Sequence, residues 1–136
     1  MDRRTFLAAF AAVAVAGPAL AGTGKAYKPG LVEKELAAGK TVFLDFYTDW
    51  CSTCARQGRV INALKAQNSK YEKNISFISV DWDKHARSNL SKRLNIPRRS
   101  TLVVLKGDTE LGRIVAGTSK KHIKALLDKA LSAAMA

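Results

Sequence analysis

The sequence predicts an α/β domain, a mixed sheet of four or five strands with helices on both faces. Three observations predict it. From residue 31 onward, segments with strand patterns alternate with segments in which apolar residues recur at helical spacing. The last two strand segments meet at Gly107, where glycine easily adopts the positive φ of a hairpin turn, and are therefore antiparallel. Cys51 and Cys54 stand where the first strong strand passes into a helix.

Each predicted element rests on its own local pattern. Mixed apolar and charged residues over 31–38 predict a short helix, which Gly39 ends. β-branched and aromatic residues over 41–47 predict a strand. A helix predicted over 52–68 makes the strands on either side of it parallel, with a right-handed crossover. The remaining predictions are strands over 75–80, 101–105 and 110–115, and helices over 84–94 and over 119–133 with Ser119 as the N-cap.

The beginning of the chain has the pattern of an export signal. Arg3 and Arg4 form a basic head, residues 6–20 are mostly apolar and uncharged, and small residues offer cleavage near Ala21. The apolar run is about fifteen residues, whereas a membrane span needs about twenty. We therefore expect a cleaved signal and a periplasmic protein, with an uncleaved anchor as the alternative. The arginine pair resembles a twin-arginine signal, and both that route and the Sec route stay open.

Three parts follow from this division. We expect the export signal over 1–21, a flexible segment rich in Gly and Lys over 22–30, and one domain over 31–136. Removing 21 of the 136 residues leaves about 115, which suits one hydrophobic core and leaves no room for a second.

The chain is basic, with 23 Lys and Arg against 11 Asp and Glu and a net charge of +12. Such an excess attracts anionic partners, among them acidic proteins and lipid head groups. Export argues against nucleic acid as a partner. Because the basic residues are scattered along the sequence, simple solvation is the plainer explanation, and peripheral contact with an anionic membrane surface is the functional one.

The two cysteines are the only ones in the chain and close almost no loop, so a bond between them adds little stability. A Cys-x-x-Cys at a strand-to-helix junction is more often a reactive dithiol. Unpaired N–H groups and the helix dipole favour a thiolate just before the first helical turn. We therefore expect Cys51 to be the exposed nucleophile and Cys54 the shielded residue that resolves the mixed disulfide. This redox-active pair requires no other cofactor.

Asp45 is the candidate proton acceptor for Cys54. On a strand, Phe43, Asp45 and Tyr47 share one face, which places the carboxylate among aromatic side chains. Burial there without a cation raises the pKa of the carboxyl and makes it a base near neutral pH. The alternative is an exposed carboxylate on a half-solvated strand.

These residues together resemble the thioredoxin family over roughly residues 31–131. The resemblance is carried by Leu44-Asp45-Phe46 ahead of Asp49-Trp50-Cys51-x-x-Cys54, by Ser100-Thr101-Leu102-Val103-Val104 and by the Gly107 hairpin. The residues before Trp50 look most like the periplasmic thioredoxin-like domain of DsbD-type thiol–disulfide interchange proteins. The resemblance implies a thioredoxin-like fold, disulfide exchange with partner proteins and a buried Asp45. It favours a reductase that receives electrons from a membrane donor.

The sequence departs from the family between and after the cysteines. Ser52 and Thr53 replace the usual Gly-Pro, and either hydroxyl can donate to the thiolate. Ser100 replaces the cis-proline that thioredoxins carry immediately before the strand that begins at Thr101. A cis bond before a residue other than proline costs about 2.5–4 kcal/mol, so we predict a trans Arg99–Ser100 bond and a more open site.

Three charged or aromatic residues near these motifs have two interpretations each. Arg98 and Arg99 either flank the sulfurs and favour the thiolate, or are solvated loop charges. Trp50 either shapes the substrate surface or is a large core side chain. The lysine that often accompanies the buried aspartate on the next strand is replaced by Phe77.

Two other functions use the same sequence features. A metal or iron–sulfur carrier would use the two thiolates, because the hydroxyl of Ser100 does not block a metal as a proline does. It lacks further soft ligands, and His85 and His122 show no metal-ligand spacing and are interpreted as surface residues, so no metal site is predicted. A binding module without catalysis would use the basic face instead.

Overall fold

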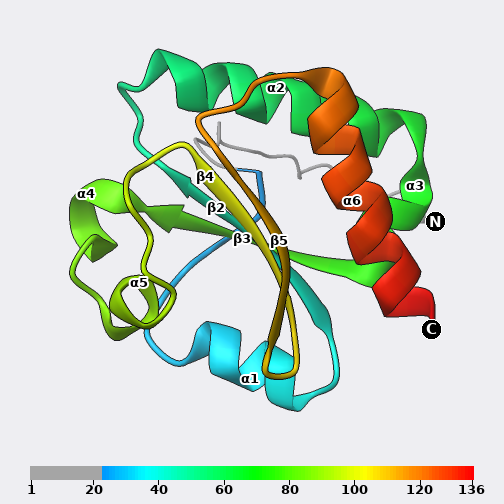
Figure 1. Ribbon diagram of the computed structural model, residues 1–136, viewed down its shortest axis with the longest axis horizontal. Coiled ribbons are helices and arrows are strands. Elements are labelled where there is room, and N and C mark those ends of the chain that lie inside the picture. Colours follow the sequence, from blue (N-terminus) through cyan, green and yellow to red (C-terminus); the bar gives the residue numbers. More distant parts are fainter. Residues whose placement is uncertain (1–22) are drawn as a thin grey trace, which may run out of the picture.

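The computed structural model describes residues 23–136 (Figure 1). The export signal expected over 1–21 therefore lies outside the described residues. The strands are β1 (Lys25–Ala26), β2 (Thr41–Tyr47), β3 (Ile75–Asp81), β4 (Thr101–Lys106) and β5 (Thr109–Val115). The helices are α1 (Leu31–Ala37), α2 (Ser52–Gln67), α3 (Ser69–Asn74), α4 (Trp82–His85), α5 (Asn89–Arg93) and α6 (Lys120–Met135).

The five strands form one mixed sheet in the order β1-β3-β2-β4-β5. β3 runs parallel to both β1 and β2, whereas β4 is antiparallel to β2 and to β5. In Figure 1, α2 and α6 lie on one side of this sheet and α1 and α5 on the other. The predicted fold class, including the fifth strand, is confirmed, and so is the parallel β2–α2–β3 connection.

The central strand β2 serves both faces of the sheet because its side chains alternate. Phe43 packs in a core with side chains from α2, α3 and α6. Val42, Leu44 and Phe46 pack in a second core with side chains from α1 and α5. Each fully buried apolar side chain of this size stabilises the fold by about 1.5–3 kcal/mol. Asp45 follows the alternation of Phe43 and is thus directed to the face that α2 covers.

Several boundaries differ from those predicted. The flexible segment expected over 22–30 contains β1, whose residues pair with Ile78 and Ser79 of β3. The single helix expected over 84–94 is divided into α4 and α5, because the Ser88 side chain accepts the Ser91 N–H and caps a new helix start. The predicted helix was expected to end at Asn68 and Ser69, but residues 69–74 form a further helix, α3.

Other local predictions are confirmed. β2 spans the predicted residues, and Gly107 has φ 57° in the hairpin turn. The side chain of Ser119 caps α6 by accepting the N–H of His122 at 3.3 Å. Within residues 23–136, none of the helices has the length and apolar character needed to cross a membrane.

Candidate active site

The two cysteines lie at the junction predicted for them. Cys51 is the N-cap of α2, with extended backbone angles of φ −90° and ψ 112°. Its Sγ accepts the backbone N–H of Cys54 at 3.1 Å. The two residues form a disulfide, with their Cα atoms 5.2 Å apart. A free N–H at the start of the helix is therefore directed at the Cys51 sulfur, which is the arrangement that stabilises a thiolate there.

Both cysteines are buried, with 4% of Cys51 and 5% of Cys54 exposed. The expectation that Cys51 is the exposed member of the pair is therefore wrong. Burial does not distinguish the two sulfurs, because the segment that carries Ser100 contacts both. What distinguishes them is position on the helix, since Cys51 caps α2 and Cys54 lies within its first turn.

Ser100 contacts both sulfurs directly. Its Oγ lies 3.2 Å from Cys51 Sγ and 3.0 Å from Cys54 Sγ. Its N–H donates to the carbonyl of Phe46 at 2.7 Å, and its carbonyl accepts the N–H of Ala116 at 2.8 Å. Ser100 is therefore attached to the ends of β2 and β5, and its hydroxyl lies close enough to donate to a thiolate on either cysteine.

The backbone of Ser100 is in the left-handed region, with φ 67°. A residue with a Cβ adopts this conformation at a cost of about 1–3 kcal/mol, so the surrounding hydrogen bonds must hold it there. Every peptide bond in residues 23–136 is trans. The prediction of a trans Arg99–Ser100 bond is confirmed.

Gln57 is a site residue that the sequence analysis did not identify. Its side chain is fully buried, and Nε2 donates to the carbonyls of Ser100 at 3.0 Å and Gly117 at 2.9 Å. One signal was present in the sequence. Gln57 lies three residues after Cys54 on a helix and thus shares its face, where a buried polar group needs partners.

Asp45 is buried, with 2% of the residue exposed. Its Oδ2 accepts the hydroxyl of Thr23 at 3.0 Å, while Oδ1 is buried without a hydrogen-bond partner within the described residues. Burial raises the pKa of Asp45 to about 6, although the Thr23 hydrogen bond and the charge of Lys65 lower it. The expected burial is confirmed, and the exposed alternative is wrong.

A cation does act on Asp45, contrary to the expectation that none is present. It comes from α2 and not from the neighbouring strand. The Nζ of Lys65 donates to the carbonyl of Thr23 at 2.5 Å, lies 3.0 Å from a carboxylate oxygen of Glu72, and is 4.2 Å from the ring centre of Phe77. Phe77 lies on β3 opposite Phe43, and Lys65 extends over its ring.

Trp50 is exposed over 63% of its surface, so the core alternative is wrong. Its Nε1 donates to Asp83 at 2.9 Å, and the guanidinium carbon of Arg99 lies 4.3 Å from the centre of its ring. A cation–π contact of this kind contributes about 0.5–1 kcal/mol at an exposed site. Arg99 is half-buried against Trp50, which differs from both a freely solvated loop charge and a direct ligand of the sulfurs.

The remaining predicted site residues have smaller parts. Ser52 is exposed and Thr53 is half-buried, and no hydrogen bond between described residues links either hydroxyl to a sulfur. Thr101 donates its hydroxyl to the carbonyl of Arg98 at 2.7 Å and closes the turn before β4. Ser100, rather than Ser52 or Thr53, therefore supplies the hydroxyl that faces the disulfide.

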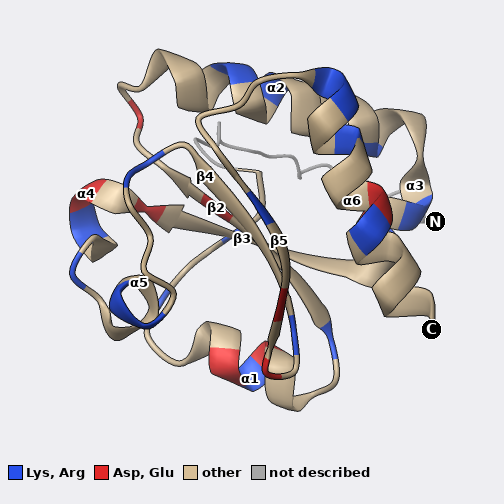
Figure 2. Cartoon of the chain, in the orientation of Figure 1, with Lys and Arg blue, Asp and Glu red and all other residues tan. Residues whose placement is uncertain are grey.

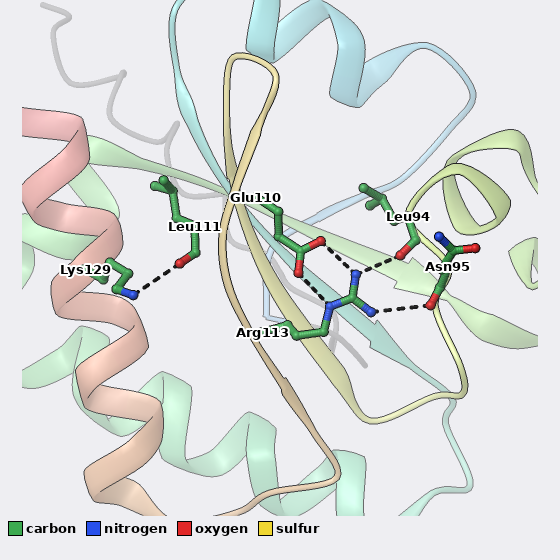
Figure 3. Close-up of polar contacts among 6 residues, drawn as sticks. All are labelled: Leu94, Asn95, Glu110, Leu111, Arg113 and Lys129. Carbon is green, nitrogen blue, oxygen red and sulfur yellow. Dashed lines mark hydrogen bonds and ion pairs between the residues drawn. The ribbon is translucent and has the colours of Figure 1, made fainter.

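The segment that leads to Ser100 is attached to β5 by an arginine that sequence analysis also missed. Figure 3 shows the guanidinium of Arg113 between the Glu110 carboxylate and two backbone carbonyls. The distances are 2.6 and 2.7 Å to Glu110, 2.7 Å to the Leu94 carbonyl and 3.4 Å to the Asn95 carbonyl. Arg113 also lowers the pKa of Glu110 by hydrogen bonding to it. These contacts of Arg113 with Glu110, Leu94 and Asn95 form a clamp that connects the end of α5 to the β4–β5 hairpin.

A mixed five-stranded sheet with a Cys-x-x-Cys disulfide at the start of the helix that follows its central strand defines the class of thioredoxin-fold proteins. The sequence model of the family described as Thioredoxin matches residues 25–129. This chain belongs to the thioredoxin family.

Individual relatives agree with this assignment. Mitochondrial Thioredoxin-2 of Schizosaccharomyces pombe is 34% identical over 94 residues, which cover 69% of this chain and 65% of that protein. A chloroplastic Thioredoxin F-type of Brassica napus is 35% identical over 98 residues, which cover 71% of this chain and 50% of that protein. The chain thus spans less than two thirds of the length of these two relatives.

Solved structures show the same fold. Trxlp from Edwardsiella tarda EIB202 has a TM-score of 0.66 at 26% identity, over 76% of this chain and 96% of that one. Thioredoxin NaTrxh from Nicotiana alata has a TM-score of 0.64 at 21% identity, over 84% of this chain and 97% of that one.

No finding supports the metal-carrier alternative. In the part of the chain from residue 23 onward, His, Cys, Asp and Glu side chains form no group of three or more that is placed to hold a metal ion.

Proposed function

We propose that the protein is a thiol–disulfide oxidoreductase that exchanges disulfides with partner proteins and works in the reducing direction. One observation carries the proposal. The Cys51 sulfur, which is bonded to Cys54, accepts a backbone N–H at the start of α2 and lies 3.2 Å from the Ser100 hydroxyl. Both donors favour a negative charge on this sulfur when the disulfide is reduced.

The first step is attack by the Cys51 thiolate on a disulfide of the partner. A new bond forms between Cys51 and one partner sulfur, and the other partner sulfur leaves as a thiolate and takes a proton from solvent. The backbone N–H of Cys54 and the hydroxyl of Ser100 hold Cys51 in its charged form before the attack.

The second step releases the partner. Cys54 loses its proton to Asp45, and its thiolate attacks Cys51, so that the Cys51–Cys54 disulfide forms and the bond to the partner breaks. The partner has then gained two electrons. Asp45 suits this role because a pKa of about 6 leaves it mostly ionised at neutral pH, yet basic enough to take a proton, and its Oδ1 has no other partner within the described residues.

The direction and the location rest on the sequence. The resemblance of the residues before Trp50 to DsbD-type domains favours a periplasmic reductase that a membrane donor re-reduces. The net charge of +12 favours peripheral contact with an anionic membrane surface. Figure 2 shows Lys and Arg spread over α2, α5 and α6, which suits a weak, non-specific contact better than one focused binding patch.

The midpoint potential of the Cys51–Cys54 couple, measured against glutathione, tests the proposal. A value near about −270 mV supports a reductase and one near about −120 mV an oxidase. The variants Cys51→Ser and Cys54→Ser are the controls, because the first removes the nucleophile and the second traps the mixed disulfide. A protein that purifies with stoichiometric metal, or whose function survives Cys51→Ser, contradicts the proposal.

A further inference from the structure

Residues 23–27, which precede α1, are fixed against the edge of the sheet. The N–H of Gly24 donates to the Ser79 side chain at 2.9 Å, and the N–H of Tyr27 donates to the Ser79 carbonyl at 2.9 Å. Between them, β1 pairs with β3. The backbone on both sides of β1 is thus held, and Thr23 has a defined position at its start.

The segment approaches the sheet so closely that only glycine fits at position 24. A Cβ placed on Gly24 would lie 2.2 Å from the carbonyl oxygen of Phe77, far inside van der Waals contact. Because this neighbour is backbone, it cannot move aside without shifting β3. The close approach is what brings Thr23 into the protein as far as Asp45.

Thr23 contacts both charged groups of this region. Its hydroxyl donates to Asp45 Oδ2 at 3.0 Å, and its carbonyl accepts the Lys65 ammonium at 2.5 Å. The salt bridge of Lys65 is with Glu72, on α3. Thr23 therefore lies between the lysine and the buried carboxylate, and the Thr23 hydroxyl is the hydrogen-bond donor that Asp45 has within residues 23–136.

The other groups that face Asp45 from the surrounding elements are few. The pKa of Asp45 responds to the charge of Lys65 from α2, and Asp45 in turn helps to raise the pKa of Tyr47 on its own strand. Its register neighbours, Ser79 on β3 and Leu102 on β4, are uncharged. α6 covers this face with apolar side chains, and the start of α2 adds the two cysteines, which titrate when reduced.

We propose that Thr23 is a positioning residue of the redox reaction, which holds Oδ2 of Asp45 so that Oδ1 is the oxygen that takes the Cys54 proton. The proposal rests on the function proposed above and adds a residue to it. In the resolving step the proton passes from the Cys54 thiol to Asp45, the Cys54–Cys51 bond forms, and the partner sulfur leaves with the electron pair of its broken bond.

The place of Thr23 also suits the return of that proton to solvent. Thr23 and Lys65 line a surface hollow of about 810 Å³ between the N-terminal segment, α2 and β3. The hydroxyl that holds Asp45 therefore belongs to a residue that borders solvent-accessible space. A hydroxyl that both donates and accepts can pass a proton from the protonated carboxyl to water.

The test is the pH dependence of the resolving step in the intact, reduced protein. Oxidised glutathione forms the mixed disulfide with Cys51, and acid-quench mass spectrometry follows its decay from about pH 4 to about pH 9. A hydrogen bond to a charged group that is lost in Thr23→Val should move the midpoint of this profile upward by about one pH unit. The plateau at high pH should stay the same, because Asp45 is then fully ionised in both proteins.

Three further variants make the result specific. Thr23→Ser keeps the hydroxyl and should restore the wild-type midpoint. Thr23→Ala removes the hydroxyl and leaves room for water, which tests the same point if the valine variant does not fold. Thr109→Val removes an exposed threonine hydroxyl on β5 and should leave the profile unchanged.

The outcomes separate the two proposals. If wild-type protein forms and resolves the mixed disulfide, and folded Thr23→Val or Thr23→Ala has the wild-type midpoint, the role of Thr23 is wrong while the function stands. If wild-type protein forms no mixed disulfide, the function itself is wrong.

Discussion

Two buried polar groups, Ser100 beside the disulfide and Asp45 on β2, are held in opposite ways. The N–H, carbonyl and hydroxyl of Ser100 all have partners, and its carbonyl has two. Asp45 has one oxygen bound to Thr23 and the other without a partner within the described residues. A group whose polar atoms all have hydrogen-bond partners is held in place. A carboxyl group with one oxygen that lacks such a partner can gain and lose a proton there.

The largest effect is expected from proline at position 100. Ser100→Pro removes the N–H that donates to Phe46 and requires φ near −65°, whereas Ser100 has φ 67°. We expect the free energy of unfolding to fall by about 3 kcal/mol or more, measured by denaturant unfolding of the oxidised protein. Ser100→Gly, which accepts positive φ, is the control. A proline variant as stable as wild type would show that the loop is not held as described.

Asp45→Asn should have an opposite, stabilising effect that depends on pH. The folded protein favours the neutral carboxyl, so the wild-type protein loses unfolding free energy as this carboxyl ionises. The loss is absent below about pH 3.8, grows between about pH 3.8 and about pH 6, and is complete above about pH 6. Asparagine avoids this cost, so stability at pH 7 should rise by up to about 3 kcal/mol, with no gain below pH 3.8. Thermal unfolding across this range measures it.

The same variant should slow the resolving step. Loss of the proton acceptor is expected to lower the decay rate of the mixed disulfide by about 100-fold at pH 7, since positioned general bases contribute about this much or more. Equal rates in the variant and the wild type would remove Asp45 from the reaction. A stability gain without a change in rate would mean that the carboxylate is only a buried group.

Ser100→Ala removes the hydroxyl that contacts the two sulfurs and keeps a residue with a Cβ at the same positive φ. Alanine and serine have a similar cost at positive φ, so stability should change little. The thiolate of Cys51 loses a donor, and its alkylation by iodoacetamide near pH 6 should slow by about tenfold. Ser52→Ala is the matched control, because that exposed hydroxyl has no contact with a sulfur among the described residues. Equal slowing in both variants would contradict a specific role for Ser100.

The smallest effect is expected at the clamp in Figure 3. Arg113→Met keeps the aliphatic stem on β5 but loses the hydrogen bonds to the Leu94 and Asn95 carbonyls. Because these groups are partly exposed, we expect a loss of about 1 kcal/mol in unfolding free energy. Hydrogen exchange at the Ser100 amide should accelerate as the loop loosens. Unchanged exchange would show that Arg113 stabilises the hairpin alone.

Local patterns predicted most of the fold. The alternation in β2 and the residues around Gly107 were sufficient for the strand and the hairpin, because these depend on side-chain alternation and turn chemistry over a few residues. The division between α4 and α5 was missed, because the Ser88 cap competes with a helix pattern that continues on both sides of it.

The candidate site was predicted in part for the same reason. Cys51 and Cys54 stand at one strand–helix junction and Asp45 lies on the strand before it, so local patterns were sufficient to predict the place of the disulfide and the burial of Asp45. Trp50 was correctly linked to the surface, but its contact with Arg99 joins residues far apart in sequence.

By itself the sequence determined the thioredoxin-like fold, the position of the dithiol at the start of a helix, and the strand face to which Asp45 belongs. These depend on neighbours along the chain. Only the tertiary structure decided that Thr23 and Lys65 meet Asp45, that Gln57 holds the Ser100 loop, and that Arg113 clamps the segment before it. Such contacts join elements through the packed interior, where the partner of a buried polar group is set by distance in space, which spacing in the sequence does not encode.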